Sequence, residues 1–282
     1  MTSTHKDAAH QNNVTRSRDM LLAAMGGLAP KTAIVLGSGL GGLADKISSP
    51  VTVAYKNLAG FPELSVAGHA GEVVAGKFSG TPVIMFKGRK HLYETNDFYP
   101  LKTMIRTMQA VGVEKLFLSC ASGSLNPAFK VGELMAISDH INFMGINPLV
   151  GPNDDDFGPR FPPMSNAWDK DLRGKLKTAA AGLKIPLHEG VYFAMRGPAF
   201  ETPAEIRMAQ KLGGDAVGMS GVPECLVARH AGMKVLGVAC LTNMGEGLSG
   251  ENLSHAHTLE NAKLAAVSFE KLVASALPEL CK

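Results

Sequence analysis

The stretch AIVLGSGLGGLADK, residues 33–46, joins a short apolar run to a loop rich in glycine. Gly37, Gly39 and Gly42 fit the pattern G-x-G-x-x-G, which is typical of a strand–turn–helix unit that binds a dinucleotide. Such a unit carries an acidic residue about 20 residues further on, where the second strand ends, to bind the ribose. The second strand is expected at 51–55, and the three residues after it are Lys-Asn-Leu. The acid is missing, which disfavours an NAD-dependent oxidoreductase.

The glycine loop still suits a smaller anion, because its backbone N–H groups are exposed and the Ser38 hydroxyl adds a donor. A second polar stretch, FKGRKHLYETND at residues 86–97, directly follows an expected strand. Arg89 offers a planar fork for phosphate oxygens, and His91 can donate to the same anion if Glu94 holds its other nitrogen or its charge. The alternative interpretation is a solvated polar loop. Together the two stretches indicate a site for free phosphate.

Two later stretches carry side chains suited to a heterocycle and to an anion. In GPAFETPAE, residues 197–205, Phe200 can stack a ring and Glu201 can accept a ring N–H. In GMSGVPE, residues 218–224, Ser220 lies between a strand end and a helix start. A valine stands where a nucleophile elbow, G-x-S-x-G, requires glycine. Ser220 is therefore interpreted as a donor to an anion and not as a nucleophile.

Strands and helices interleave along the chain, which indicates one α/β domain built on a central sheet. Ser79-Gly80-Thr81-Pro82 is typical of a hairpin turn, so the sheet is predicted to be mixed. The predicted strands are 33–36, 51–55, 72–78, 83–87, 115–120, 133–138, 191–195, 216–219 and 234–241. The predicted helices are 98–111, one from the capping box Thr202-Pro203-Ala204-Glu205 to Gly213, 223–231, and a C-terminal helix capped by Ser254. Residues 1–20 are expected to be a disordered polar tail, and residues 21–282 a single domain.

Composition excludes several classes of protein. The 282 residues are 45% hydrophobic and 19% charged with a net charge of +3, which suits a soluble globular protein and gives no sign of a nucleic-acid partner. No apolar run approaches the roughly 20 residues of a membrane span, and no signal peptide is evident, so a cytoplasmic protein is expected. Four cysteines without a C-x-x-C pair indicate reduced thiols. No metal is expected, because His255 and His257 are spaced i, i+2 and Asp154-Asp155-Asp156 lacks the alternating ligands of an EF-hand.

Taken together, the motifs GSGLGG, GHAG, GRKHLYE, HINFMGINPLVGPND, GPAFETPAE, DAVGMSGVPE and LTN resemble, in order and spacing, the trimeric purine nucleoside phosphorylases that act on 6-oxopurine nucleosides. The resemblance runs from about Lys31 to the C-terminal helix. It implies a single α/β domain with a twisted mixed sheet surrounded by helices, assembled as a homotrimer. It also implies reversible phosphorolysis of nucleosides such as inosine and guanosine to free base and ribose 1-phosphate. Phosphate would be a co-substrate, and neither a metal nor an organic cofactor would take part.

The resemblance assigns roles to individual residues. Those that would surround the phosphate are Ser38, His69, Arg89, His91, Ala121 through its backbone N–H, and Ser220. Those that would hold the ribose are Tyr93, Met219 and His257. Those that would meet the base are Tyr192, Phe200, Glu201 and Asn243. The expected catalytic residues are His91, Glu94, Glu201 and Asn243. Phe161, in the Gly/Pro-rich loop at residues 145–163, would reach the site of a neighbouring subunit.

The chain departs from the family in places, and alternatives stay open. Where the family commonly reads N-A-A-G-G, this chain has Cys120-Ala121-Ser122-Gly123-Ser124, which leaves the role of the side chain at position 120 open. The stretch after Asn243 also matches the family poorly. A non-catalytic nucleoside or phosphate sensor, a 5′-methylthioadenosine phosphorylase and a xanthosine-preferring phosphorylase are the alternatives. Glu201 and Asn243 disfavour methylthioadenosine, because a 6-amino purine would be better met by an acid at position 243.

Overall fold

The apolar run before the glycine loop forms β1 (Thr32–Leu36), all of whose residues are buried. It lies between β4 (Thr81–Lys87) and β5 (Lys115–Ser124) and runs parallel to both. A strand flanked by parallel neighbours is covered on both faces, which explains its unbroken apolar sequence. The computed structural model describes residues 3–66, 68–250 and 253–282, without the side chains of residues 3–8, 255 and 257.

The strands form one mixed sheet in the order β2-β3-β4-β1-β5-β8-β7-β6-β9. The further strands are β2 (Ser48–Ala54), β3 (Glu72–Phe78), β6 (Leu134–Asn142), β7 (Leu187–Ala194), β8 (Ala216–Gly218) and β9 (Lys234–Met244). Because β5 pairs with β9 as well as with β8, the strands from β5 to β9 close into a ring. The mixed sheet predicted from the sequence is confirmed, and the β3–β4 turn is shorter than predicted, since Thr81 and Pro82 already belong to β4.

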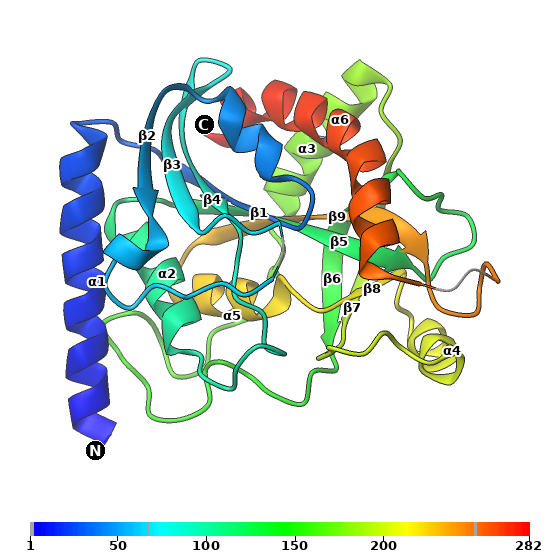
Figure 1. Ribbon diagram of the computed structural model, residues 1–282, viewed down its shortest axis with the longest axis horizontal. Coiled ribbons are helices and arrows are strands. Elements are labelled where there is room, and N and C mark those ends of the chain that lie inside the picture. Colours follow the sequence, from blue (N-terminus) through cyan, green and yellow to red (C-terminus); the bar gives the residue numbers. More distant parts are fainter. Residues whose placement is uncertain (1–2, 67, 251–252) are drawn as a thin grey trace.

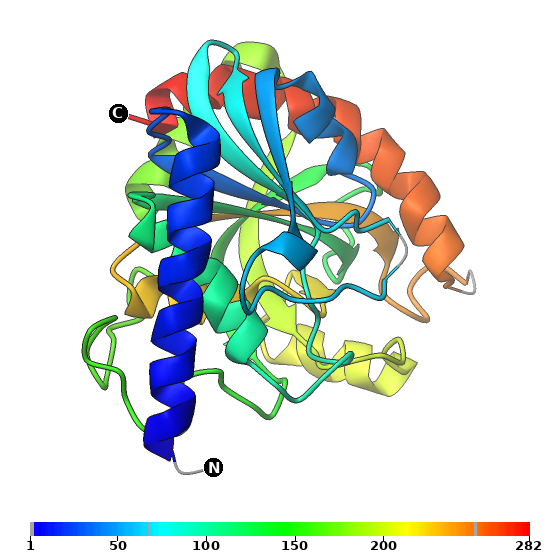
Figure 2. The same cartoon turned by 60° about the vertical axis from the view of Figure 1, so that its left-hand side comes forward.

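Helices cover both faces of the sheet (Figure 1). They are α1 (Ser3–Met25), α2 (Tyr99–Ala110), α3 (Lys170–Leu183), α4 (Pro203–Lys211), α5 (Val222–His230) and α6 (His255–Leu280), with short 3-10 helices at Gly41–Lys46 and Tyr55–Asn57. Buried residues of α3, α6 and the first 3-10 helix share one apolar cluster, and those of α1, α2 and α5 share another. Viewed from the side, α1 lies outermost, against α2 (Figure 2).

The glycine loop after β1 is shaped by close packing. Gly37 lies so near β5 that a Cβ atom would come within 2.7 Å of the Ser119 carbonyl oxygen. Gly39 has a φ of +78°, and a Cβ there would come within 2.7 Å of Ala262 in α6. Both positions therefore require glycine. The helix expected after this loop is only the 3-10 helix at Gly41–Lys46.

The disordered tail predicted for residues 1–20 is wrong over the described residues, which form α1 from Ser3 onward. Its inward side chains are His10, Val14, Ser17, Leu21 and Met25, all of them buried. Their spacing places them on one face of a helix. Only three of these five are apolar, so the stripe is easily missed in a polar sequence. Packing against the rest of the protein, rather than local propensity, accounts for this helix.

The cysteines are unpaired, as the sequence predicts. Cys120, Cys225 and Cys240 are free and buried, and Cys281 is free and half-buried. Within the described ranges, no group of His, Cys, Asp and Glu side chains is arranged to hold a metal ion. Among those same residues, no helix is long and apolar enough to cross a membrane.

Candidate active site

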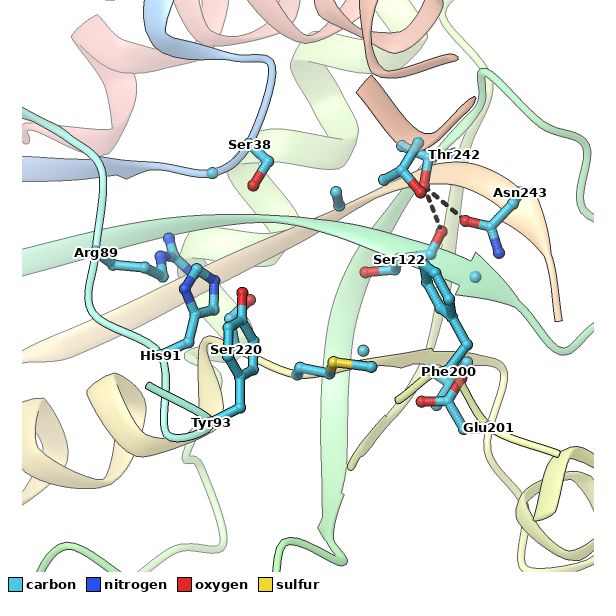
Figure 3. Close-up of a pocket in the computed structure, with 17 residues that line it drawn as sticks. Ser38, Arg89, His91, Tyr93, Ser122, Phe200, Glu201, Ser220, Thr242 and Asn243 are labelled. Atoms are coloured by element: carbon cyan, nitrogen blue, oxygen red, sulfur yellow. Dashed lines mark hydrogen bonds between the residues drawn. The ribbon is translucent and has the colours of Figure 1, made fainter. Parts of the chain in front are cut away.

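A pocket lies where the carboxyl ends of β1, β4, β5, β8 and β9 converge (Figure 3). Ligands of open α/β sheets commonly bind at this edge. The predicted residues that line it are Ser38, Arg89, His91, Tyr93, Ala121, Phe200, Glu201, Met219, Ser220 and Asn243. The sequence analysis gave no role to the further lining residues, which are Gly37, Ser122, Gly123, Val217, Gly218, Thr242 and Thr258.

Arg89 marks the cationic end of the pocket. Its side chain is buried, and Nη2 donates to the carbonyl oxygens of Val35 at 3.1 Å and Ser119 at 2.8 Å. Nη1 donates to Cys120 Sγ at 3.4 Å. These contacts fix the guanidinium at the carboxyl ends of β1 and β5. Arg89 therefore presents a positive charge, held in place before any ligand arrives, to the space beside the glycine loop.

His69 braces this end of the pocket from behind the lining. Its Nε2 lies 3.2 Å from Ser38 Oγ, and its Nδ1 lies 3.1 Å from the backbone nitrogen of Arg89. The Arg89 carbonyl oxygen also lies 3.0 Å from Nδ1. With the proton on Nε2, the ring accepts from the Arg89 N–H and donates to Ser38; with the proton on Nδ1, it donates to the Arg89 carbonyl and accepts from Ser38. Burial, followed by the charge of His91, lowers the pKa of His69 to about 4. His69 is thus a neutral ring at pH 7 that orients the Ser38 hydroxyl.

Glu94 holds His91 at the pocket wall. One carboxylate oxygen accepts from the backbone N–H of His91 at 2.7 Å and lies 3.3 Å from Nδ1 of its ring. Burial raises the pKa of Glu94, but hydrogen bonds from His91 and Ser65 outweigh burial and hold this pKa below its usual value. The ionised carboxylate therefore favours a proton on Nδ1. The rings of His91 and Tyr93 stack with centroids 4.8 Å apart.

The other end of the pocket combines an aromatic face, a carboxylate and an amide. Phe200 is 40% exposed, whereas Glu201 beside it is only 7% exposed. Burial raises the pKa of Glu201, and its Oε1 has no hydrogen-bond partner among the described residues. Asn243 Oδ1 accepts from the Thr242 hydroxyl at 2.9 Å, and its Nδ2 donates to the Met244 carbonyl at 2.9 Å. One N–H of the Asn243 amide is thus left to donate to a ligand.

Tyr192 does not line the pocket. It is fully buried, and its hydroxyl accepts from the Ser220 backbone N–H at 3.4 Å. Burial raises the pKa of the Tyr192 hydroxyl, which therefore stays neutral. The ring fills the space behind Gly218, where a Cβ atom would come within 2.3 Å of the hydroxyl oxygen. Tyr192 supports the wall of the pocket from behind and does not contact its interior.

Two other predicted residues lie apart from this pocket or outside the description. Phe161 is 86% exposed and is not among the lining residues. His257 falls within α6, but its side chain lies outside the described residues.

Sequence reasoning missed Ser122, Thr242 and Glu224. The first two line the pocket, and the carboxylate of Glu224 lies 3.4 Å from Arg89 Nε. The only sequence signal for the two hydroxyls is their place next to predicted residues at strand ends. Glu224 sits in the first turn of α5, where an acidic residue is also explained by the helix dipole.

Comparisons with known proteins identify the family of this chain. The family model of the phosphorylase superfamily matches residues 31–278. Purine nucleoside phosphorylase 1 of Bacillus subtilis (strain 168) is 49% identical over 245 residues, which cover 87% of this chain and 90% of the relative. Purine nucleoside phosphorylase of Bos taurus is 44% identical over 251 residues, covering 86% of this chain and 87% of the relative. The Schistosoma mansoni purine nucleoside phosphorylase, solved in complex with inosine, superposes with a TM-score of 0.91 at 34% identity, covering 97% of this chain and 98% of that chain.

The chain therefore belongs to the phosphorylase superfamily. Within that superfamily it groups with the purine nucleoside phosphorylases, which are pentosyltransferases, and it is an enzyme of this class.

Proposed function

We propose that the enzyme phosphorolyses 6-oxopurine nucleosides such as inosine and guanosine, in ribo or deoxyribo form, to free base and (deoxy)ribose 1-phosphate. The observation that carries this proposal is that the base end of the pocket offers one hydrogen-bond donor and one hydrogen-bond acceptor. Among the described residues, the Asn243 amide uses one N–H in its bond to Met244 and keeps the other available, and Glu201 keeps an unpartnered carboxylate oxygen. A 6-oxopurine has the complementary groups, an acceptor at O6 and a donor at N1.

The cationic end supports phosphate as the second substrate. The fixed Arg89 guanidinium, the Ser38 hydroxyl beside His69 and Ser220 just before α5 line one part of the pocket. Arginine is a usual ligand of phosphate in proteins, and a serine hydroxyl can donate to the same anion. His91, held by Glu94, adds a ring on the same side. These groups would hold phosphate close to the sugar carbon that it attacks.

The reaction needs no protein nucleophile. A phosphate oxygen forms a bond to C1′ of the ribose while the bond from C1′ to N9 of the purine breaks, and its electron pair leaves with the base. The sugar becomes oxocarbenium-like between the two. Charge building on the purine is stabilised by the Asn243 N–H, and Glu201 anchors the opposite edge of the ring. Positioning phosphate in this way can contribute on the order of 7–11 kcal/mol.

The proposal also covers the binding of the ribose and the association of the subunits. Tyr93 and Met219 would hold the ribose, which their place in the pocket lining supports, and His257 would meet the 5′-hydroxyl. The enzyme would work in the cytoplasm as a homotrimer, with only small-molecule substrates as ligands and no cofactor. The exposed ring of Phe161 supports a site shared between subunits, because a side chain so exposed in one chain is available to a neighbour.

One assay tests the proposal. The protein is mixed with inosine or guanosine, with and without phosphate, and the free base is quantified. Release of hypoxanthine or guanine that depends on phosphate is the expected result. No release from either nucleoside would overturn the proposal and favour a sensor on the same fold. Faster release of base from 5′-methylthioadenosine than from inosine would instead favour the sister enzyme, and adding xanthosine ranks the 6-oxopurines.

A further inference from the structure

Arg89 and Glu224 form a buried ion pair at the cationic end of the pocket. Arg89 Nε and Glu224 Oε1 are 3.4 Å apart, and the two side chains are 1% and 2% exposed. Neither of these atoms makes a hydrogen bond within the described residues. Buried polar atoms are usually hydrogen-bonded, so this arrangement calls for an explanation.

Glu224 is not needed to hold Arg89 in place. The carbonyl oxygens of Val35 and Ser119 already fix Nη2, and Cys120 accepts from Nη1. What these neutral acceptors do not supply is a negative charge. Burial disfavours the charged guanidinium, and the carboxylate of Glu224 is the largest of the contributions, with Cys120 and Tyr192, that together offset burial and raise the pKa of Arg89. Glu224 therefore acts on Arg89 through its negative charge, since the contact between Nε and Oε1 lacks hydrogen-bond geometry.

We infer that Glu224 is the resident counter-ion of Arg89 and that it limits how tightly the empty site binds phosphate. The inference rests on the proposed function, since it takes phosphate as the ligand of Arg89. Phosphate arrives as a second anion beside a cation that is already neutralised, and it is repelled by the carboxylate. In a buried site this repulsion is screened far less than in water. Glu224 does not line the pocket, so it acts through its charge behind Arg89 and is not a catalytic residue.

This arrangement has a consequence for turnover. A buried guanidinium without a counter-ion would destabilise the empty enzyme. It would also hold phosphate and the product ribose 1-phosphate tightly. With Glu224 present, the charge stays balanced while the site is empty, and the anionic product leaves more readily.

Isothermal titration of inorganic phosphate, without nucleoside, tests the inference on the wild-type enzyme, Glu224→Gln and Glu224→Asp. Gln keeps the shape and removes the charge, so we expect the dissociation constant for phosphate to fall by roughly three- to tenfold. In Glu224→Asp the shorter side chain moves the carboxylate away from Arg89 Nε. The dissociation constant of this variant for phosphate should therefore fall by a smaller factor. A general structural defect would weaken phosphate binding instead. The sign of the effect thus separates the two explanations.

A control outside the pocket is Glu189→Gln, because Glu189 Oε1 pairs with Arg173 Nε at 3.3 Å and its other oxygen pairs with Lys177, in a more exposed place. The dissociation constant of the Glu189→Gln variant for phosphate should equal that of the wild-type enzyme. If Glu224→Gln folds only when phosphate is present, the inference is supported, because phosphate then replaces the missing counter-ion. Unchanged or weaker phosphate binding in Glu224→Asp and in any folded Glu224→Gln would overturn it. Failure of the wild-type enzyme to bind phosphate would count against the proposed function.

Discussion

Two contacts orient the Asn243 amide. Oδ1 lies 2.9 Å from the Thr242 hydroxyl, which is also 3.3 Å from the Ser122 carbonyl oxygen, and Nδ2 donates to the Met244 carbonyl at 2.9 Å, which leaves the second N–H of the NH₂ group for an acceptor. A carboxylate in the same place could only accept. A buried polar atom left unpaired by the wrong base costs roughly 1–3 kcal/mol, so one hydrogen bond can discriminate strongly. The distinction between 6-oxo and 6-amino purines is thereby assigned to a single side chain and its neighbour.

Asn243→Asp should therefore lower kcat/KM for inosine by roughly ten- to a hundredfold, the equivalent of that penalty. Activity on adenosine should rise relative to the wild type, because a carboxylate accepts from the 6-amino group. Both nucleosides are measured on both proteins at saturating phosphate. If the ratio of inosine to adenosine activity does not move, Asn243 does not read the base.

The protonation of Glu201 should control how tightly the enzyme binds a nucleoside. Burial raises its pKa above the ordinary value of 4.5, and only the ionised form accepts the N1–H of the base. Nucleoside binding should weaken as the pH falls through this raised pKa. Glu201→Gln removes the titration and should lower kcat/KM at neutral pH by roughly tenfold or more.

The measurement is the ratio of wild-type to Glu201→Gln kcat/KM for inosine at each pH. This ratio cancels the titration of phosphate and of other shared groups. It should shrink as the pH falls through the raised pKa of Glu201, and a constant ratio would show that the ionised Glu201 is not what binds the base.

Position after a strand end indicated part of the pocket, as with Ser38 after β1 and Arg89 and His91 after β4, whereas Ala121 and Asn243 were assigned through the resemblance to the family. The sequence could not separate residues inside the pocket from those behind it. Tyr192 and His69 support the lining without joining it, and this depends on how β7 and the segment before β3 pack. Glu224 was missed for a similar reason, since only the folded chain brings α5 beside Arg89.

Among the helices, α1 depends most on tertiary contacts. His10 is buried, lies 3.0 Å from Thr103 Oγ1 in α2, and makes edge contacts with Tyr99 and Phe157. Burial, followed by the charges of Arg106 and Lys102, lowers the pKa of His10 from 6.5 to about 3. In the unfolded chain His10 binds a proton below pH 6.5, whereas in the folded chain it does not. Stability should therefore fall as the pH drops from 6.5 toward 3.

His10→Gln removes this linkage. The wild-type enzyme should lose about 1–2 kcal/mol more stability than the variant between pH 7.5 and 5. Denaturant titrations at both pH values measure the difference. At pH 7.5 both side chains are neutral, so the comparison there isolates the lost packing. Equal losses in the two proteins would show that His10 is not held neutral by the docking of α1.

The elements that the sequence predicted well have local signals at both ends. Strand β3 was placed with its observed bounds because a Ser79-Gly80 turn follows it. Helix α3 was missed although Asp169 caps it, accepting from the backbone N–H groups of Asp171 and Leu172. Its apolar residues Leu172, Leu176 and Ala180 repeat every four positions. That signal was present in the sequence, whereas the stripe on α1 was hidden among polar residues.

At the scale of the whole molecule, the exposed apolar side chains fit a larger assembly. Phe161 is 86% exposed and Val150 is 76% exposed, both in the long loop after β6. The loop is tied down, since Arg106 lies 3.9 Å from the Phe157 ring centroid and Gln11 in α1 donates to Asp156 at 3.0 Å. An anchored loop with an exposed aromatic tip suits contact with a second copy of the chain.

If the subunits of a trimer share their sites, oligomers that mix two different variants should contain some sites with wild-type KM. Phe161→Ala removes an exposed ring, so it should change the stability of a single chain by less than about 0.5 kcal/mol. It should nevertheless raise KM for inosine, because the neighbouring site loses an aromatic wall.

Co-expressing differently tagged Phe161→Ala and Glu201→Gln chains and purifying the mixed oligomers tests whether one subunit supplies Phe161 to the site of another. In these oligomers a Phe161→Ala chain has an intact pocket and receives Phe161 from its Glu201→Gln neighbour, so a subset of sites should regain wild-type KM. No recovery in mixed oligomers, or a fully active monomer in sedimentation, would show that each chain builds its site alone.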